Sequence, residues 1–272
     1  MTGNEQSMAA SSASALAGPE LHEEWSARYR TEENEAVFED AFDRILAAFS
    51  PPAGATILDA GCGTASHTIR LARRGFRLES VDFSDHALEL ARANAAEAGL
   101  ADQVHFRQAD LMALPFADGQ FQYAFCWGVL LHVPEVERAV VELARVVGPG
   151  GKLAVSEPNM RSLQTLALRA GRRLRGRSGQ DIRETPAGIE KWRKAAEGDL
   201  VTRQTDIKWL IERFATEGLT LHSRSAGQFT DVYTRIGSPA LRRAVHRLNA
   251  LWFHRVGRPG PAVANILVFE RT

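Results

Sequence analysis

Apolar positions recur with two different periods along residues 55–157. Short apolar runs alternate with longer stretches whose apolar residues stand three or four positions apart, a spacing typical of amphipathic helices. Ser84 and Gly99 flank one such stretch and are residue types that begin and end helices. The pattern predicts strands over residues 55–59, 77–81, 103–108, 121–127 and 151–156, and helices over 64–74, 85–98 and 134–147.

This alternation predicts a parallel sheet with helices on both faces, because consecutive parallel strands need crossover connections. Five chemically distinctive residues fall at or just after the ends of the predicted strands. They are Asp59, Asp82, Asp110, Trp127 and Glu157. Ligands of such sheets bind outside the carboxyl ends of the strands. We therefore expect these side chains to meet at one binding site.

The pattern changes after Glu157. Residues 159–204 are polar and arginine-rich, and they contain helical stretches without clear bounds. Thr205 is a candidate N-cap for a helix over 206–217. Strands are predicted over 219–225 and 262–271, with a helix over 240–255 between them. The fold class is therefore α/β, a Rossmann-like, mostly parallel seven-stranded sheet with an N-terminal helical cap and lid inserts.

The chain divides into five predicted segments. They are a disordered tail (1–19), a helical cap (20–50), the core (51–158), a basic lid insert (159–204) and the end of the sheet (205–272) with a helical insert at 228–261. No apolar run reaches the length of a membrane span, and the first residues lack the basic start of a secretory leader. Two cysteines do not make a disulfide framework, so we expect a reducing, cytoplasmic setting.

Acidic and basic residues are segregated along a chain whose net charge is zero. Residues 1–160 carry a balance of −11, and residues 161–272 carry +11. The basic part is a candidate surface for an anionic substrate or partner. The alternative interpretation is an arginine-rich face that contacts only solvent. Both interpretations stay open.

The segment Ile57–Leu71, ILDAGCGTASHTIRL, combines a strand end, a sharp turn and a helix start. Gly61 and Gly63 permit positive φ and a close approach of the backbone to a ligand. Ser66 stands where a dinucleotide fingerprint would have its third glycine. Asp82 follows Gly63 by 19 residues, where a carboxylate accepts hydrogen bonds from ribose hydroxyls.

The segment resembles the first motif of class I S-adenosylmethionine-dependent methyltransferases. Three later segments resemble that family in the same order, namely residues 108–111 (QADL), 125–133 (FCWGVLLHV) and 143–153 (LARVVGPGGKL). Together the matches cover about residues 55–157. The chain is similar to the broad group that contains quinone-biosynthesis and natural-product methyltransferases.

The resemblance implies S-adenosylmethionine as cofactor, with S-adenosylhomocysteine as its product. It also implies roles for nine residues. Asp59, Gly61, Cys62 and Gly63 would form the methionine-binding turn, Asp82 would hold the ribose, Phe83, Asp110 and Leu111 would hold the adenine, and Trp127 would line the site. The alternative for Trp127 is a tryptophan packed in the core.

His132 is the candidate general base, because an imidazole titrates near neutral pH. The alternative is a histidine that lines the pocket without moving protons. Tyr29 is a second candidate base, and it shares a predicted helix face with Trp25, a candidate substrate contact; for both, packing between cap and core is the alternative. Glu157 would orient the substrate or cap a helix. No His or Cys spacing suits zinc, so no metal is expected.

The expected reaction is metal-independent methylation of an oxygen or nitrogen of a small molecule. Arg172 and Arg173 lie in the basic insert, where they would pair with an acidic group of the acceptor. A second interpretation places the basic and aromatic faces at a membrane, as in a lipid or quinone methyltransferase. An RNA or protein methyltransferase and a non-catalytic cofactor-binding protein are further alternatives. No nucleic acid partner is expected, because 125–133 lacks the Asn/Asp-Pro-Pro-aromatic run of many base methyltransferases.

Overall fold

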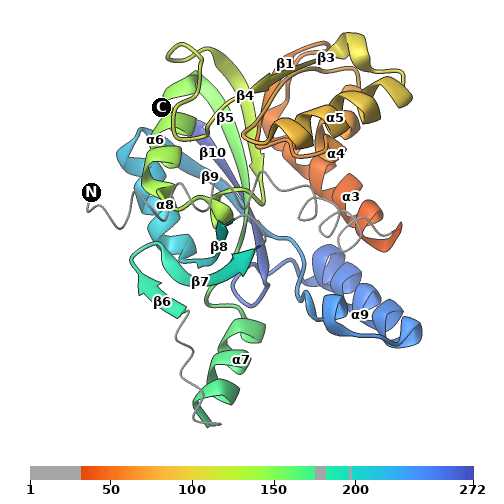
Figure 1. Ribbon diagram of the computed structural model, residues 1–272, viewed down its shortest axis with the longest axis vertical. Helices are drawn as coiled ribbons and strands as arrows, with labels where there is room; N and C mark the ends of the chain where they lie inside the picture. Colours follow the sequence, from red (N-terminus) through yellow and green to blue (C-terminus); the bar gives the residue numbers. More distant parts are fainter. Residues whose placement is uncertain (1–31, 175–181, 196–197) are drawn as a thin grey trace.

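Seven strands form one mixed sheet in the computed structural model, which describes residues 32–174, 182–195 and 198–272 (Figure 1). The strand order is β3-β2-β1-β4-β5-β10-β9. The strands are β1 (Thr56–Ala60), β2 (Arg77–Asp82), β3 (Val104–Gln108), β4 (Phe121–Trp127), β5 (Val147–Pro158), β9 (Leu219–Ala226) and β10 (Ala264–Arg271). β1 to β5 are parallel, and β10 runs antiparallel to both β5 and β9. The predicted Rossmann-like sheet is confirmed.

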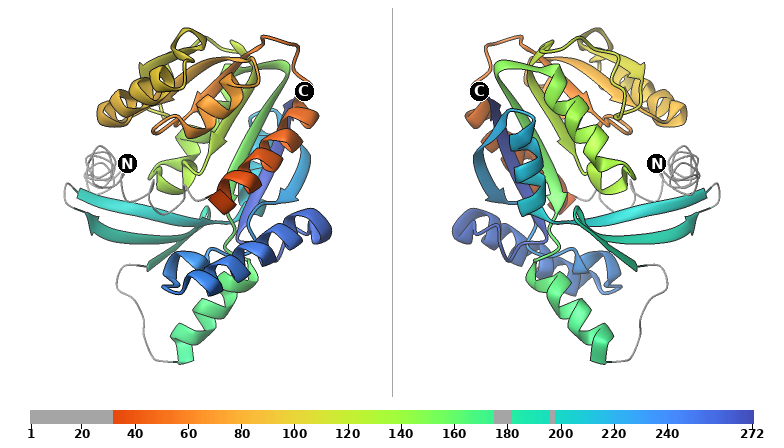
Figure 2. Two further views of the ribbon diagram at one scale, coloured as in Figure 1. Left: turned by 90° about the vertical axis from the view of Figure 1, so that its right-hand side faces the viewer. Right: turned by 90° about the vertical axis from the view of Figure 1, so that its left-hand side faces the viewer.

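Helices cover both faces of this sheet (Figures 1 and 2). They are α3 (Glu32–Phe49), α4 (Ser66–Ala72), α5 (Asp85–Glu97), α6 (Val136–Val146) and α8 (Ile207–Thr216), with 3-10 turns η1 (Ala101–Gln103) and η2 (Leu130–His132). One apolar cluster joins the sheet to α6 and α8, and another joins it to α3 and α4. Residues at or next to the carboxyl ends of β1, β2, β4 and β5 line one cavity, described below.

The predicted N-cap of α5 is found in the structure, whereas the predicted N-cap of α8 is not. The Ser84 hydroxyl accepts a hydrogen bond from the backbone N–H of Ala87, as an N-cap residue does. The predicted cap of α8 at Thr205 is wrong. Asp206 caps this helix by accepting from the Lys208 N–H, and the Thr205 hydroxyl bonds to a side chain of the site instead.

The basic insert contains a helix and a second sheet. Helix α7 (Leu163–Leu174) is followed by three antiparallel strands, β6 (Ile182–Thr185), β7 (Gly188–Ala195) and β8 (Gly198–Thr205). The expectation of helical stretches over 159–204 is therefore right only for the first part. Successive side chains of β8 point to opposite faces, so that Leu200, Thr202 and Gln204 line a cavity whereas Val201, Arg203 and Thr205 are buried in the protein.

The C-terminal insert holds the predicted helix. It comprises η3 (Val232–Arg235), α9 (Pro239–Leu251) and a π-helical turn, η4 (Trp252–Val256). The buried Asn249 side chain bonds to the backbone of Thr230 in both directions and fixes α9 to the preceding loop. α7 and α9 lie at the same end of the molecule, below the sheet (Figure 2). Within the described ranges, no helix is both long and apolar enough to span a membrane.

Candidate functional site

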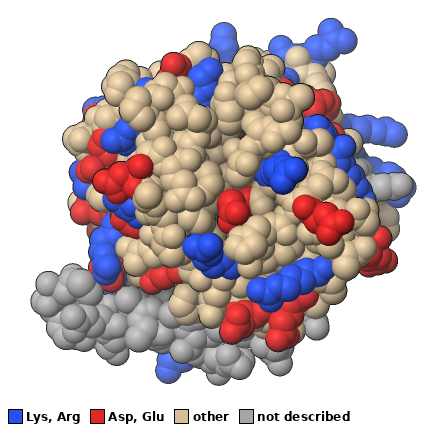
Figure 3. Space-filling model, turned by 90° about the horizontal axis from the view of Figure 1, so that it is seen from above, with Lys and Arg blue, Asp and Glu red and all other residues tan. Residues whose placement is uncertain are grey.

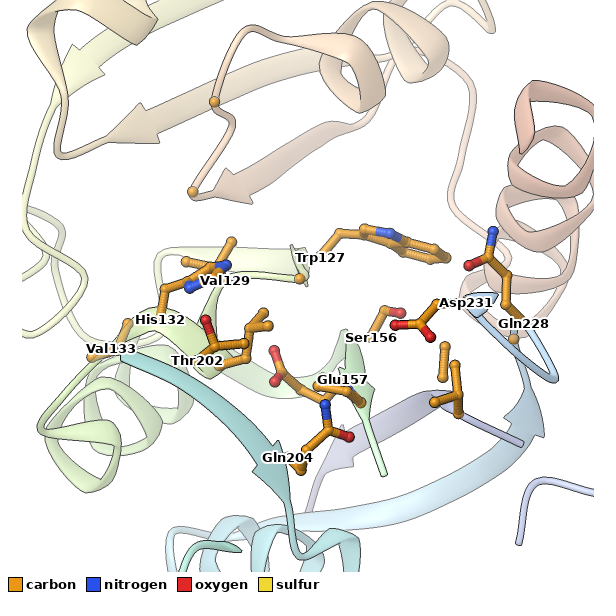
Figure 4. A pocket seen from close by; sticks show the side chains of 18 of the residues that line it. Trp127, Val129, His132, Val133, Ser156, Glu157, Thr202, Gln204, Gln228 and Asp231 are labelled. Carbon is orange, nitrogen blue, oxygen red and sulfur yellow. The ribbon is translucent and has the colours of Figure 1, made fainter. Parts of the chain in front are cut away.

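A cavity of about 1150 Å³ lies between the carboxyl ends of the core strands and the three-stranded sheet of the insert (Figure 4). A pocket for one small ligand is usually about 300–1,000 Å³, so this cavity lies above the usual range for one ligand. We call the part beside the β1, β2 and β3 ends the cofactor half. The part beside Glu157, His132 and the insert sheet is the acceptor half.

The turn after β1 shapes the cofactor half. Gly61 has φ +89°, and a Cβ at this position would stand 2.4 Å from Cγ2 of Val129. The backbone N–H groups of Gly61 and Cys62 both donate to the Val81 carbonyl, at 2.8 and 2.9 Å. Any side chain at Gly61 would therefore both strain the turn and strike the wall of the cavity.

The Asp82 carboxylate accepts hydrogen bonds from two turns, the one after β1 and the one before α5. Oδ2 accepts from the Gly63 N–H at 2.8 Å, and Oδ1 accepts from the Ser84 N–H at 2.9 Å. The Asp82 side chain also lines the cavity. Phe83 is 37% exposed and lines the cavity next to it, as does Asp110, whose Oδ1 accepts from the Met112 N–H at 2.8 Å. These groups fit a nucleoside with free ribose hydroxyls.

Asp59 differs from the other predicted cofactor residues, all eight of which line the cavity. Its carboxylate is buried behind the turn and accepts a hydrogen bond from the Thr68 hydroxyl. Burial raises the pKa of Asp59 to about 7, although the Thr68 hydrogen bond acts in the opposite direction. Asp59 therefore supports the turn from behind, and the predicted direct contact with the methionine part has no support in this geometry.

Trp127 connects the cavity with helix α3. Its ring stacks on Phe42 with the centroids 5.1 Å apart, and it meets Phe38 edge-on at 5.9 Å. The same side chain lines the cavity (Figure 4). The two interpretations made for Trp127, cofactor lining and core packing, are thus compatible. α3 is also held by the buried Arg70, whose guanidinium pairs with Glu39 at 2.7 Å.

Glu157 is the central polar group of the acceptor half. It is 1% exposed to solvent and enters the cavity near Ser156, Thr202 and Gln204 (Figure 4). Oε2 accepts from the Thr205 hydroxyl at 3.3 Å, whereas no hydrogen bond of good geometry reaches Oε1 from the described residues, although the backbone N–H groups of Leu130 and Leu131 approach the carboxyl and favour its charged form. Burial raises the pKa of Glu157 to about 8, and the opposing charge of Arg203 does not cancel this effect. A buried carboxyl oxygen without a partner is suited to a ligand.

His132 sits on η2, opposite strand β8. Its Nδ1 lies 2.9 Å from the Val201 carbonyl oxygen. A carbonyl only accepts hydrogen bonds, so Nδ1 carries the proton and Nε2 is the basic nitrogen of the neutral ring. Burial lowers the pKa of His132 to about 4, and Arg193 and Arg203 favour the neutral form further. His132 is therefore uncharged at neutral pH, and it is a weak base.

Arg203 fixes the insert sheet above the site. Its guanidinium is buried, and it donates to the carbonyl oxygens of Leu130, Val133 and Pro134 at 2.8, 3.0 and 3.2 Å. It also pairs with Glu190 of β7 at 2.7 Å. Because these bonds join β7 and β8 to the loop that carries His132, the sheet forms a fixed roof over the acceptor half.

Several cavity residues were missed by sequence reasoning. They are Thr202 and Gln204 on β8, Gln164 on α7, and Gln228 and Asp231 in the loop before η3. The Gln164 amide joins two of these segments, because Nε2 donates to the Asp231 carboxylate and Oε1 accepts from the Asp231 N–H. Thr202 and Gln204 stand in a continuous polar run, Thr202–Thr205, which gives no sign of which side chains face the cavity. The others follow no motif.

Cationic side chains surround the outer part of the acceptor half. The predicted Arg172 and Arg173 line the cavity, together with Arg169, Lys191, Arg193 and Arg235. Trp25 and Tyr29 fall outside the described residues, so their roles stay predictions. No group of three or more His, Cys, Asp or Glu side chains suited to a metal ion occurs in the described ranges.

The chain matches known proteins over its core. A family described as "Methyltransferase domain" matches residues 57–151. The methyltransferase GfsG of Streptomyces halstedii is 35% identical over 127 residues, which cover 46% of this chain and 44% of that protein. The O-methyltransferase cnsE of Penicillium expansum is 32% identical over 134 residues, 49% of each chain. This chain thus spans about half the length of the curated relatives that it matches.

Similarity of fold extends further. The crystal structure of magnesium protoporphyrin IX methyltransferase from Synechocystis PCC 6803, with S-adenosylhomocysteine bound, superposes with a TM-score of 0.62. The superposition covers 93% of this chain and 95% of that one, at 16% sequence identity. This likeness concerns the fold, including the part of the chain that follows residue 157.

Proposed function

We propose that this chain, which belongs to the class I S-adenosylmethionine-dependent methyltransferases, transfers a methyl group to a small molecule held in the acceptor half. One observation carries the proposal. The cavity is continuous from the glycine turn to Glu157, and its volume accommodates a nucleoside cofactor and an acceptor together. The relatives GfsG and cnsE are themselves named methyltransferases, which supports the same reaction type.

The residues of the cofactor half fit S-adenosylmethionine. Gly61 and Gly63 leave space beside the backbone, Asp82 offers acceptors to the ribose hydroxyls, and Phe83 and Asp110 lie where the adenine would be held. When bound, this cofactor supplies an electrophilic methyl carbon on a positively charged sulfur that departs as a neutral thioether. The chain itself must align the acceptor with that carbon and exclude water, and alignment alone is worth about 7–11 kcal/mol.

Glu157 is a better candidate proton acceptor than His132. A catalytic base works best when its pKa is near the working pH. The pKa of Glu157 is raised to about 8, whereas the pKa of His132 is lowered to about 4. We infer that Glu157 binds the acceptor hydroxyl or amine through Oε1, and that its ionised form, which becomes the main form above about pH 8, takes the acceptor's proton. His132 would hold the acceptor through Nε2 without acting as the main base.

The cationic rim supports an acceptor with an acidic group. Arg172 and Arg173 project from α7 into the same cavity that contains Glu157. A carboxylate or phosphate bound there would form charge-assisted hydrogen bonds with their guanidinium groups. The acceptor would then be oriented by its anionic end at the rim, with its nucleophile at Glu157. The second interpretation, a lipid acceptor, shares this chemistry when the lipid carries a phosphate.

The experiment is a transfer assay without a chosen acceptor. The purified protein is incubated with methyl-labelled S-adenosylmethionine and a fractionated cell extract, in parallel with the Gly61→Val variant. The variant places a side chain against Val129 and should lose cofactor binding. Gly54→Ala is the matched control, because Gly54 also has a positive φ (+73°), a Cβ there would meet open space, and Gly54 does not line the cavity.

Label in low-mass material that needs the wild-type protein and persists with Gly54→Ala would support the proposal. Label in RNA or protein would overturn the small-molecule acceptor. If the protein binds S-adenosylhomocysteine in calorimetry but labels no fraction, methyl transfer itself is overturned, and the protein is a cofactor-binding protein of another activity.

A further inference from the structure

Exposed large apolar side chains are concentrated on two helical segments. Among the described residues, eleven such side chains are exposed, and eight of them lie on α7, α9 and η4. They are Leu163, Leu166, Leu168 and Leu174 on α7, Leu241, Leu248 and Leu251 on α9, and Val256 on η4. Leu174 is 88% exposed. Exposure of so many leucines to water is unfavourable, and large exposed apolar patches are typical of interaction sites, so this cluster indicates an interaction site.

The same segments carry only positive charge. Residues 163–174 and 239–256 contain seven arginines and no aspartate or glutamate. Arg172, Arg173, Arg243, Arg247 and Arg255 are exposed. In contrast, acidic and basic side chains are mixed on the face of the molecule seen from above in Figure 3, at the end away from α7 and α9. The combination of leucine and arginine is therefore specific to this end.

The leucines of α9 point away from the protein. Leu241, Leu248 and Leu251 are seven and three positions apart, which places them on one face of the helix. The opposite face is held in the protein by His246 and Asn249, and both of these side chains are buried. Packing of α9 on its own domain thus leaves the leucine stripe uncovered.

α7 and α9 are joined into one surface at the base of the molecule. Both lie at the same end in two perpendicular views (Figures 1 and 2). The start of α7 is bonded to both segments that flank α9, because Gln164 bonds to Asp231 before it and the Leu163 N–H donates to the Pro261 carbonyl at 3.1 Å after it. We call α7, α9 and η4 together the basal surface.

The geometry points to a docking surface for an anionic lipid bilayer. Helices that lie in a membrane interface combine an apolar face with flanking arginines, which interact with lipid phosphates. Binding of a nucleic acid would account for the arginines through contacts with phosphates, but it would not account for the eight exposed apolar side chains. Charge complementarity and the leucines therefore favour the bilayer over a nucleic acid.

The basal surface adjoins the mouth of the cavity. Leu168, Arg172 and Arg173 belong to the surface and also line the cavity. A protein docked in this orientation would present its acceptor half to the lipid interface. The docking proposal does not depend on methyl transfer, because the vesicle measurement below needs neither cofactor nor acceptor.

The test is flotation with vesicles of phosphatidylcholine alone and with phosphatidylglycerol added. The wild-type protein should bind the anionic vesicles at least about tenfold more tightly than the neutral ones, since each arginine near the surface contributes about fivefold. The triple variant Leu241→Ser, Leu248→Ser, Leu251→Ser should lose at least about tenfold. Arg243→Ser with Arg247→Ser should weaken binding to anionic vesicles only.

Two control substitutions lie elsewhere on the surface. Leu221→Ser replaces an exposed leucine of β9, and Arg73→Ser replaces an exposed arginine after α4; neither should change vesicle binding. Folding of each variant is verified by its thermal unfolding and its circular dichroism spectrum. Should the triple variant not fold, Leu174→Ser alone provides the test, since a side chain that is 88% exposed tolerates a hydroxyl.

Unchanged vesicle binding by folded leucine variants would overturn the proposal, as would a wild-type protein that binds no anionic vesicle. Tight, salt-sensitive binding of an RNA oligonucleotide that the arginine variants lose and the leucine variants keep would reassign the surface to nucleic acid. Vesicle binding by a protein that labels no acceptor would uphold docking while the proposed methyl transfer fails.

Discussion

The two halves of the cavity are built from different kinds of contact. In the cofactor half, Asp82 bonds to backbone groups at positions 63 and 84, and the residues involved follow successive strands of one sheet. In the acceptor half, Thr205 bonds to Glu157 across 48 positions, and Arg203 bonds to Leu130 across 73. The first half depends on turns that follow neighbouring strands, joined by bonds of Asp82 that span 19 positions or fewer, and the second depends on packing of an insert across longer separations.

This difference shows which part of such a protein sets its specificity. The cofactor half is made of backbone turns that depend on a few glycines and carboxylates. The acceptor half is made by side chains from β8, α7 and the loop before η3, and these segments are added to the sheet. Added segments change the acceptor without disturbing the cofactor, in keeping with functions grafted on one fold.

The largest expected effect concerns the roof. Arg203→Met should lower the free energy of unfolding by about 3–5 kcal/mol, because it leaves Glu190 and three carbonyl groups without their buried partner. If the cofactor half and the acceptor half are energetically independent, the affinity of the variant for S-adenosylhomocysteine stays within about threefold of wild type. Urea unfolding and calorimetry measure the two quantities.

Lys208→Met is the control, since Lys208 is an exposed cation on α8. A parallel fall in cofactor affinity for Arg203→Met would contradict the separation of the halves. It would mean that the roof also holds the turn that carries Gly61.

The next effect is the pH dependence of Glu157. Its pKa is raised in the folded protein to about 8, so the folded state keeps a proton that the unfolded state releases near its ordinary pKa of 4.5. Stability is therefore lost as pH rises from about 4.5 to about 8. Glu157→Gln should remove this loss, and the variant should be more stable than wild type by roughly 2–4 kcal/mol near about pH 9.

Urea unfolding at about pH 5 and about pH 9 checks this prediction. Glu89→Gln, at an exposed position of α5, should show no such difference between the two pH values. Equal stability of wild type and Glu157→Gln at the higher pH would show that the carboxyl is hydrated and that it is not the strong base proposed above.

A moderate effect is expected in the cofactor half. Asp82→Asn keeps the shape of the side chain and removes its charge, so affinity for S-adenosylhomocysteine should fall about 10–100-fold, the equivalent of losing roughly 1.5–3 kcal/mol of charged hydrogen bonding. Calorimetry measures the change. Asp85→Asn, an exposed neighbour in the first turn of α5, is the matched control. Similar losses in both variants would indicate a general charge effect and would remove Asp82 from the proposed ribose contact.

The same division governs what the sequence predicted. The strands and turns that position Gly61, Asp82 and Asp110 follow from local signals, such as an acid at a strand end and Ser84 at a helix start. These signals act over a few residues, and the mostly parallel, seven-stranded sheet was confirmed with them. The roles of these residues toward the cofactor stay predictions.

Prediction failed where distant segments decide the structure. Thr205 has the residue type of an N-cap, but the neighbouring Asp206 takes that place and the hydroxyl reaches Glu157. The strands of the roof escaped notice because they are rich in charged and polar residues, some of which line the cavity, as Lys191 does, or pair with the buried Arg203, as Glu190 does. Glu190 reads as a surface residue in the sequence, and only the fold shows that it pairs with this arginine.

The smallest expected effect is the pH dependence of stability that comes from His132, and it tests whether the insert sheet excludes water from this side chain. The pKa of His132 is lowered from 6.5 to about 4, so the unfolded state takes up a proton before the folded state does. Stability is therefore present above about pH 6.5 and is lost as pH falls toward about 4, with a decrease of about 1–2 kcal/mol near about pH 5. His132→Asn should lose this dependence, because its amide nitrogen replaces Nδ1 as the donor to Val201.

Urea unfolding of both proteins between about pH 7 and about pH 5 measures the effect, with His222→Asn on the exposed part of β9 as control. If wild type and His132→Asn lose stability equally on acidification, water reaches the imidazole beneath the roof. The pKa of His132 would then be near the ordinary value of a histidine, and His132 would be a stronger base than a fully buried imidazole. His132 would then be the better candidate base than Glu157, and the packing of the insert would not decide which residue takes the proton.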